Sequence, residues 1–389
     1  MSDLSDRSGD SLTKPPACWR ERLLAWRNRL VADPKFQRWA ASFPLTRPIA
    51  RRRARQLFDL CAGFVYSQIL DAFIRLNVAE ILFEGPATTS ELARRLSLSP
   101  DRTLTLLRAT SALGLTMTLR PVNGEDRFAL GELGAALLGN PGVAAMVEHH
   151  AMLYADLRDP VALLRGEARE TALGGYWPYA ARGALDHLSA EQIAAYSGLM
   201  SASQPLIADD VLDAFPIGRH RVLMDVGGGE GRFLASAAQR DRKLKLMLFD
   251  LPPVAERART HFESLGLAHR AEVHGGDFQV DSLPKGADLI SLVRVIHDHD
   301  DDIVRVLLKA IHAALPANGT LIVAEPMSGV AGAEPIGDAY FGFYLMAMGR
   351  GRPRTAAEIT ELLIQAGFRK AQETATRRPM LTGLVVAEV

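Results

Sequence analysis

The sequence is poor in cysteine and has no excess charge, and both features exclude classes of protein. Cys18 and Cys61 are the two cysteines among 389 residues, too few for a disulfide scaffold or a thiolate metal cluster. Lys plus Arg and Asp plus Glu number 45 each, so no net charge attracts nucleic acid. We find no unbroken apolar run of the roughly 18 residues that a membrane span needs. Residues 1–14 also lack the apolar stretch of a secretory signal. We therefore expect a multidomain cytoplasmic protein.

Although the net charge of the whole sequence is zero, its N-terminal arm, residues 1–60, is basic. The arm holds 13 Lys or Arg against 6 Asp or Glu, and three of the four tryptophans. If Trp19–Leu30 is a helix, four apolar side chains share one stripe, and arginines flank it. These four are Trp19, Leu23, Trp26 and Leu30. An arm that packs on a partner subunit would explain this pattern. A peripheral membrane contact through residues 19–55 would explain it as well, because arginine side chains can reach past an apolar stripe to the lipid surface.

Residues 61–140 have the pattern of a small helical domain that ends in a β-hairpin. An apolar helical pattern covers residues 64–82. Thr88 and Glu91 form a capping box before one short helix, and Ser99 can cap the next, which begins at Pro100. Strands over 116–119 and 127–130 would flank the turn sequence Asn123-Gly124. Two short helices followed by a hairpin predict a winged helix.

A winged helix can bind DNA, but the charge of this one argues against that function. Residues 61–140 hold 7 Lys or Arg and 8 Asp or Glu, whereas a DNA-binding surface needs many contacts to phosphate. We expect no nucleic acid partner and assign the domain to dimerisation and to covering a substrate. Residues 141–205 form a predicted helical connector. Its aromatic residues are candidates for a pocket wall or for core: Tyr154, Tyr176, Trp177 and Tyr179.

Residues 206–389 alternate short apolar strands with helices, which predicts a parallel α/β sheet. The first strand, 222–226, leads into a glycine-rich loop, and a helix follows from about Arg232. The loop carries the pattern D-x-G-x-G-x-G, formed by Asp225, Gly227, Gly229 and Gly231. A dinucleotide-binding loop would need its third glycine where Arg232 stands. The spacing instead resembles the S-adenosylmethionine loop of Rossmann-like methyltransferases, in which the acid faces the methionine ammonium.

Two further strands end in residues suited to a nucleoside. Asp250 ends the strand 246–250, 19 residues beyond Gly231, near where a ribose-binding acid is expected. Alternatively, Asp250 caps the turn that follows it. After the third strand, Asp277 could accept from an adenine amino group and Phe278 could stack on the ring.

The fourth and fifth strands place an imidazole and carboxylates at their ends. The fourth, 288–296, precedes His297 and Asp298, and the fifth, 320–324, precedes Glu325. If the two strands are neighbours, these side chains meet at one sheet edge. His297 could then deprotonate an alcohol that attacks a methyl sulfonium, supported by Glu325 or Asp298. A metal site of His297, His299 and Asp300 lacks an apparent further ligand, so we predict no metal.

Together these motifs resemble the O-methyltransferase family that includes plant phenolic and acetylserotonin enzymes. The resemblance covers nearly all of residues 61–389. The motifs that carry it are Asp225–Gly231, Phe249–Pro252, Gly276–Phe278, Arg294–Asp298, Glu325 and Arg354-Thr355. It implies an α/β, Rossmann-like methyltransferase sheet at the C-terminus, an N-terminal helical winged-helix dimerisation domain, and a homodimer. It further implies S-adenosyl-L-methionine as cofactor, with His297 as base. The implied cofactor contacts include Asp250, Asp277, Phe278 and Arg294.

This sequence departs from the family pattern at two positions. His299 stands where a tryptophan is usual, and Pro353 stands where many plant members have a glutamate that supports the histidine. Glu325 or Asp298 must therefore support His297 without that glutamate.

The apolar run 338–348 and the basic segment 349–354 resemble the carotenoid branch of the family in purple photosynthetic bacteria. That branch comprises the hydroxyneurosporene and demethylspheroidene O-methyltransferases. It implies a small apolar hydroxylated substrate, the end hydroxyl of a carotenoid, and work at the membrane surface. Two alternatives are an O-methyltransferase of a soluble phenol or polyketide, and a winged-helix regulator that senses S-adenosylmethionine. A regulator would not need the base His297.

Overall fold

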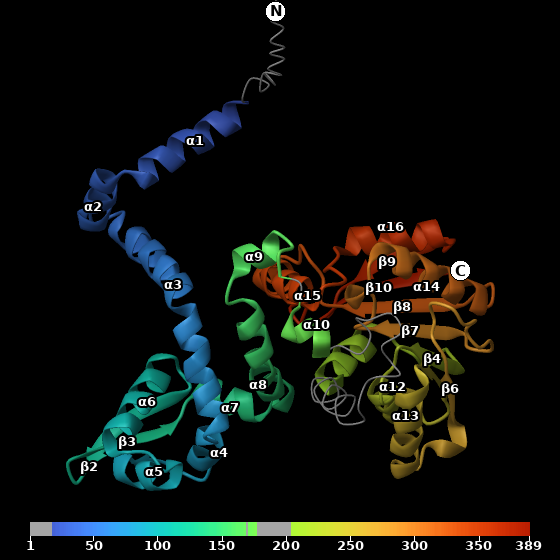
Figure 1. Ribbon diagram of the computed structural model, residues 1–389, viewed down its shortest axis with the longest axis horizontal. Helices are drawn as coiled ribbons and strands as arrows, with labels where there is room; N and C mark the ends of the chain where they lie inside the picture. The colour runs from blue at the N-terminus through green and yellow to red at the C-terminus, as the bar shows by residue number, and fades with distance from the viewer. Residues whose placement is uncertain (1–17, 169, 177–203) are drawn as a thin grey trace, which may run out of the picture. The chain divides into compact units, whose positions relative to one another are not determined.

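A computed structural model describes residues 18–168, 170–176 and 204–389 (Figure 1). Residues 1–14, which were predicted to lack a secretory signal, lie outside the described residues. The candidate wall residues Trp177 and Tyr179 also lie outside them. The chain divides into two compact units, Met1–Ala72 and Phe73–Val389. The proposed boundary between arm and winged helix, at residue 60, falls within one continuous helix.

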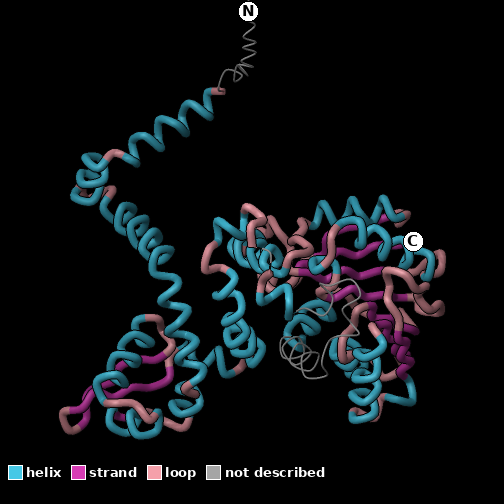
Figure 2. Tube along the Cα trace, in the orientation of Figure 1, coloured by secondary structure: helices cyan, strands magenta, loops and turns pink. Residues whose placement is uncertain are grey.

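Three helices make up the described part of the first unit, without a strand among them (Figure 2). They are α1 (Trp19–Ala32), α2 (Pro34–Ser42) and α3 (Arg47–Arg75). The predicted helix from Trp19 is confirmed, and it ends where Asp33 caps α2 by accepting from the Lys35 backbone N–H at 2.8 Å. None of the residues of α1 is buried, and Trp19 and Trp26 are 70% and 61% exposed. The apolar stripe of α1 therefore remains available to a partner or a membrane.

Helix α3 differs from the sequence expectation in one respect and adds one feature to it. By length and composition alone it could cross a membrane, although Asp59 and Asp71 interrupt its apolar residues, so the expectation of no long unbroken apolar run stands. Its apolar side chains Phe58 and Phe64 are exposed. The predicted helix over 64–82 is also interrupted, since Asn77 adopts a left-handed conformation (φ 52°) between α3 and α4 (Val78–Phe83). Asparagine is among the residues that tolerate this conformation.

The winged helix is present in the second unit. It contains α5 (Thr89–Leu96), α6 (Pro100–Ala112) and a three-stranded sheet in the order β1-β3-β2. The strands are β1 (Ala87–Thr88), β2 (Thr116–Val122) and β3 (Glu125–Leu130). Asn123 and Gly124 both have positive φ, at 53° and 80°, as a two-residue hairpin turn requires. The predicted capping box of Thr88 and Glu91 is confirmed.

A helical connector follows the hairpin. It comprises α7 (Glu132–Leu138), α8 (Pro141–Asp156), α9 (Pro160–Leu164) and α10 (Ala172–Tyr176). Buried side chains of α8, α9 and α10 pack with those of α15 (Gly342–Met348), including Leu153, Leu163 and Tyr344. The connector thus contributes core to the C-terminal part of the chain.

The C-terminal sheet has seven strands in the order β6-β5-β4-β7-β8-β10-β9. The strands are β4 (Val222–Val226), β5 (Lys245–Asp250), β6 (Ala271–Gly275), β7 (Leu289–Val293), β8 (Thr320–Glu325), β9 (Lys370–Thr374) and β10 (Gly383–Glu388). Strands β4 to β8 pair in parallel as predicted, but β10 is antiparallel to both neighbours. The expectation of a fully parallel sheet is wrong there, because β9 and β10 join through a short connection without a crossover helix.

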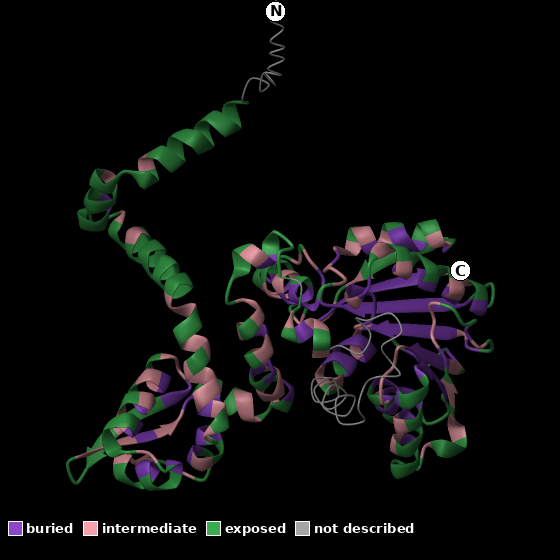
Figure 3. Ribbon diagram, viewed as in Figure 1, coloured by how far each residue is buried: buried purple, intermediate pink, exposed green. Residues whose placement is uncertain are grey.

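Alternate residues of the strands pack on opposite faces of this sheet, which Figure 3 shows as a buried layer between more exposed helices. On one face, Met224 and Ile290 pack with α14 (Asp301–Ala314) and α16 (Ala356–Ala366). On the other, Leu223 and Leu289 pack with α12 (Arg232–Arg240), α13 (Pro252–Ser264) and the helical residues 204–214. Burial on both faces explains the continuous apolar strands in the sequence.

Candidate active site

The glycine-rich loop lies between β4 and α12. Gly227, Gly229 and Gly231 all have left-handed φ, at 69°, 59° and 76°. At Gly231 a side chain is also excluded by space, since a Cβ would lie 2.3 Å from the Phe262 ring. The loop therefore needs glycine for its conformation, and it brings backbone N–H groups to the start of α12.

Asp225, the penultimate residue of β4, has a buried carboxylate beside this loop. Its Oδ1 accepts a hydrogen bond from Ser291 Oγ at 2.6 Å, while its buried Oδ2 has no hydrogen-bond partner among the described residues. Burial raises the pKa of Asp225 to about 7. A Cβ on Gly228 would lie 2.6 Å from Oδ2, so the loop needs glycine at this position to pass the carboxylate. A ligand cation here would supply the missing donor, which fits the ammonium of S-adenosylmethionine.

Asp250 ends β5 on the neighbouring strand and holds the same loop. Its Oδ2 accepts from the Gly229 N–H at 2.8 Å and its Oδ1 from the Leu251 N–H at 2.7 Å. The turn-capping role considered from the sequence is therefore present. A carboxylate can accept more than one hydrogen bond on each oxygen, so this role is compatible with a ribose contact.

Asp277 and Phe278 follow β6 at the same sheet edge. Asp277 accepts from the Gln279 N–H at 2.9 Å and orders the turn. The Phe278 ring meets the His299 ring edge-on, with centroids 5.3 Å apart. Burial, and next the neighbouring His297, lower the pKa of His299 to about 4. The imidazole is thus neutral near pH 7, and it packs against Phe278 as an aromatic ring.

His297, Asp298 and Glu325 come together as the strand order predicted. Strands β7 and β8 are parallel neighbours, with Val293 opposite Ala324. One Glu325 oxygen contacts His297 Nδ1, and the other accepts from the Val295 and Ile296 N–H groups at 2.8 and 2.7 Å. Asp298 Oδ1 lies 3.1 Å from His297 Nε2. The buried imidazole is therefore flanked by a carboxylate at each nitrogen.

These carboxylates set the protonation of the imidazole. Burial alone would lower the pKa of His297, but the Asp298 and Glu325 carboxylates outweigh it, so the pKa is raised. Burial raises the pKa of Asp298 to about 6. The arrangement therefore stabilises an imidazolium, which is the state of a histidine base after it has accepted a proton.

The turn before His297 has a strained backbone. The predicted fourth strand, 288–296, was too long, because β7 ends at Val293 and Arg294 adopts a positive φ of 60°. A 3-10 turn, Ile296–Asp298, follows. A left-handed non-glycine residue costs about 1 kcal/mol or more, and the bonds from Glu325 to the next two N–H groups offset that strain.

Arg354, which the sequence offered only as part of a motif, also supports this turn. Its guanidinium is buried and donates to the carbonyls of Ile296 and His299 at 2.6 and 2.7 Å. It also donates two hydrogen bonds to Asp301 Oδ1, from Nε at 2.9 Å and from Nη2 at 2.6 Å. These bonds bracket His297, so Arg354 fixes the turn from the segment in which Pro353 replaces the family glutamate. A long-range bond to a carbonyl leaves no pattern that sequence reasoning could detect.

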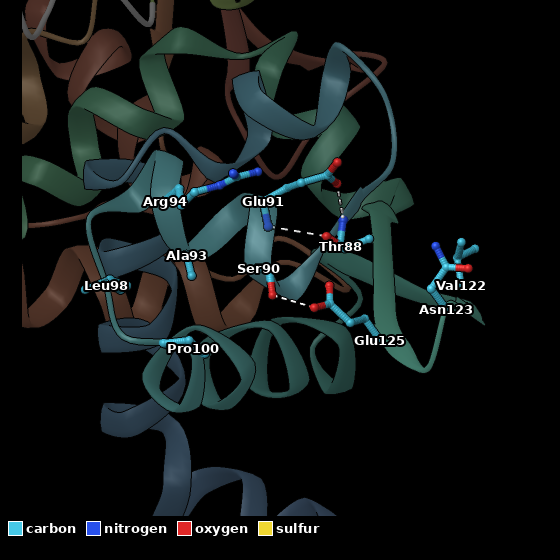
Figure 4. A pocket seen from close by; sticks show the side chains of 10 residues that line it. All are labelled: Thr88, Ser90, Glu91, Ala93, Arg94, Leu98, Pro100, Val122, Asn123 and Glu125. Atoms are coloured by element: carbon cyan, nitrogen blue, oxygen red, sulfur yellow. Dashed lines mark hydrogen bonds between the residues drawn. The ribbon is translucent and has the colours of Figure 1, made fainter.

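Outside this cluster, the described part of the chain offers a surface pocket and no metal site. Among those residues, no group of three or more His, Cys, Asp and Glu side chains could hold a metal ion. A pocket of about 620 Å³ lies on the winged helix, lined by α5 and the hairpin turn (Figure 4). Its polar groups bond to one another, with Ser90 Oγ 2.6 Å from Glu125 and the Thr88 N–H 2.7 Å from Glu91. This pocket contains none of the predicted site residues.

Comparisons with known proteins match two ranges of the chain to two domain families. Residues 154–369 match the O-methyltransferase domain family and residues 58–140 the O-methyltransferase dimerisation domain family. The chain is 46% identical over 379 residues to demethylspheroidene O-methyltransferase of Cereibacter sphaeroides, covering 97% of this chain and 98% of that one. It is 31% identical over 340 residues to acetylserotonin O-methyltransferase of Rattus norvegicus, with 84% and 75% covered. Human N-acetylserotonin methyltransferase, solved in complex with SAM, shares the fold with a TM-score of 0.73 at 24% identity, with 86% and 97% covered.

Proposed function

The chain belongs to the O-methyltransferase family, as its motifs predicted, and from this premise we propose that it methylates the hydroxyl of a hydroxylated carotenoid. The observation that carries this proposal is the 46% identity, over nearly the whole of both chains, to a demethylspheroidene O-methyltransferase. The methyl donor is S-adenosylmethionine, which when bound supplies an electrophilic methyl group on a positively charged sulfur. The buried, unpartnered oxygen of Asp225 supports this choice of donor.

In the proposed mechanism His297 is the general base. Its Nε2 would take the proton of the acceptor hydroxyl while its Nδ1 stays bonded to Glu325, which leaves the acceptor oxygen nucleophilic. The positive charge then resides on the imidazole, between Glu325 and Asp298, where both carboxylates stabilise it. A positioned base contributes roughly 10²–10⁴-fold in rate.

The proposed donor contacts are the side chains at the ends of β4, β5, β6 and β7. Asp225 binds the ammonium, and Asp250 binds the ribose across the loop that it also orders. Asp277 and Phe278 hold the adenine, with the His299 ring as a further wall. Arg294 contacts the donor from the strained turn before His297.

The acceptor class is tested by incubating the enzyme with labelled S-adenosylmethionine and a panel of hydroxylated carotenoids and phenols. We expect label in a carotenoid that bears a hydroxyl and none in the same carotenoid already methylated there. Label confined to a phenol would overturn the carotenoid assignment and favour an O-methyltransferase of a soluble phenol or polyketide. A folded protein that binds the donor but labels no acceptor would favour a winged-helix regulator that senses S-adenosylmethionine.

We further propose that the enzyme is a cytoplasmic homodimer that touches the membrane surface through residues 19–55. The chain carries a dimerisation domain, and exposed apolar side chains such as Phe58 and Phe64 lie on the helix at its start. The exposed Trp19 and Trp26 of α1, with four arginines on the same helix, suit an anionic lipid surface. A carotenoid dissolved in the bilayer would be within reach of such an enzyme.

A further inference from the structure

Two consecutive histidines of α8 bond to two tyrosines that are one helical turn apart, far along the chain. His149 Nε2 lies 2.7 Å from Tyr344 Oη, and His150 Nε2 lies 2.8 Å from Tyr340 Oη. His149 and Tyr344 are buried. These two imidazole–phenol pairs join α8 to residues 335–348 in two adjacent places, so they fix the rotation of that segment as well as its distance.

The segment that these pairs hold has an irregular backbone. Residues Pro335–Phe341 form a π-helix, and α15 continues it as an ordinary α-helix. A π-helical turn contains an extra residue and is rare unless tertiary contacts maintain it. Tyr340 lies in the π-helix and Tyr344 in the α-helix, so one pair holds each side of the transition.

Aromatic contacts lead from this clamp to the proposed base. The Tyr340 ring meets the Phe341 ring edge-on at 5.1 Å, and the Phe341 ring meets the His297 imidazole at 6.1 Å with an angle of 79°. A shift of the π-helix by one residue would turn Phe341 away by about 100°, the rotation of one helical position. The register of the segment therefore decides what lies beside His297.

We propose that His149 and His150 are positioning residues for methyl transfer, holding through Tyr344 and Tyr340 the helical register that places Phe341 beside His297. Phe341 then confines the acceptor hydroxyl to the approach at which His297 can take its proton. This inference rests on the proposed role of His297. Burial first, and then His150, lower the pKa of His149 to about 4, and burial raises the pKa of Tyr340. Both groups are thus neutral near pH 7, and they suit an apolar acceptor because His149 bonds to Tyr344 and Tyr340 bonds to His150.

The test removes one hydrogen bond while keeping an aromatic ring at each position. His150→Phe and Tyr340→Phe each delete the same bond and should each lower kcat about tenfold, the equivalent of about 1.4 kcal/mol. The double variant should lose no more than either single one, because they share one interaction. His150→Gln should restore most of the rate, since its amide can replace the ring nitrogen. Donor affinity measured by calorimetry should stay at the wild-type value. His269→Phe, at an exposed histidine, is the matched control and should keep the wild-type kcat.

Amide hydrogen exchange provides a readout that does not depend on the acceptor. Tyr340→Phe and Tyr344→Phe should each speed exchange in residues 335–348 by at least about tenfold, since the clamp no longer resists local opening. Exchange at the wild-type rate would overturn the inference, and so would faster exchange with an unchanged kcat on the acceptor that the wild type labels. A wild-type enzyme that labels only phenols would contradict the carotenoid assignment and leave this test intact on a phenol.

Discussion

At the scale of single residues, Glu325 has two tasks, one for each carboxylate oxygen. One oxygen binds the ring nitrogen of His297 and the other binds two backbone N–H groups of the turn that carries it. The same side chain thus orients the imidazole, raises its pKa and offsets the strain at Arg294. An amide in its place could keep hydrogen bonds but would lose the charge.

Glu325→Gln should therefore move the pH dependence of kcat/KM. As the proposed base, His297 must be unprotonated, so activity should rise with pH through its raised pKa. Removing one of the two carboxylates that raise this pKa should shift the acidic limb to lower pH, with a smaller rate on the plateau. Asp298→Asn is the matched variant and should shift the limb in the same direction. Coincident acidic limbs in wild type and Glu325→Gln, measured between about pH 5 and 9, would contradict the assigned pairing.

Much of this residue pattern was predictable, because parallel strands bring their ends to one edge. That rule placed Glu325 beside His297, whereas the bond from the Gly229 N–H to Asp250 was not predicted. Arg354 could not be predicted in its role, since it bonds mainly to carbonyls, which every residue has. The replacement of the family glutamate by Pro353 pointed to a missing acid, whereas the structure supports the turn from that segment with a cation.

At the scale of elements, the turn 296–301 depends on a side chain from a distant segment. Arg354 donates to two carbonyls and one carboxylate from a single buried guanidinium. A lysine keeps the charge but has no planar fork with which to reach all three.

Arg354→Lys should lower the free energy of unfolding by about 2–3 kcal/mol, because buried carbonyls lose charged donors. It should also lower kcat, since the turn that carries His297 loosens. Arg352→Lys is the matched control: its ion pairs are at the surface, with the side chain 43% exposed, so its stability should change by less than about 1 kcal/mol. Denaturant unfolding and steady-state kinetics check both variants. Equal stabilities for the two lysine variants would refute the role given to Arg354.

The sequence predicted elements well where local chemistry decides them and less well where tertiary contacts do. The capping box at Thr88 and the hairpin turn at Asn123-Gly124 are local, and both are confirmed. The end of β7 depends on long-range bonds to Glu325, so the predicted strand 288–296 continues past the true end at Val293. The π-helical turn left no local pattern, since its support comes from α8.

At the scale of the whole molecule, the N-terminal arm and the proposed active site lie in separate compact units. Deleting residues 1–34 removes α1 with Trp19 and Trp26. It should reduce sedimentation with anionic vesicles at low salt and slow methylation of a carotenoid held in those vesicles. It should spare turnover of the same carotenoid in detergent. A changed mass in solution with unchanged vesicle binding would instead assign the arm to subunit packing.

The central claim is that this O-methyltransferase activates its acceptor through His297, and single-turnover methyl transfer by His297→Ala tests it most directly. We expect the variant to bind S-adenosylmethionine with near wild-type affinity by calorimetry, because the donor contacts lie on other residues. The rate of label transfer to the acceptor should fall at least about 100-fold, because the proton transfer alone is lost. A folded variant that binds the donor and transfers the methyl group at close to the wild-type rate would contradict the account.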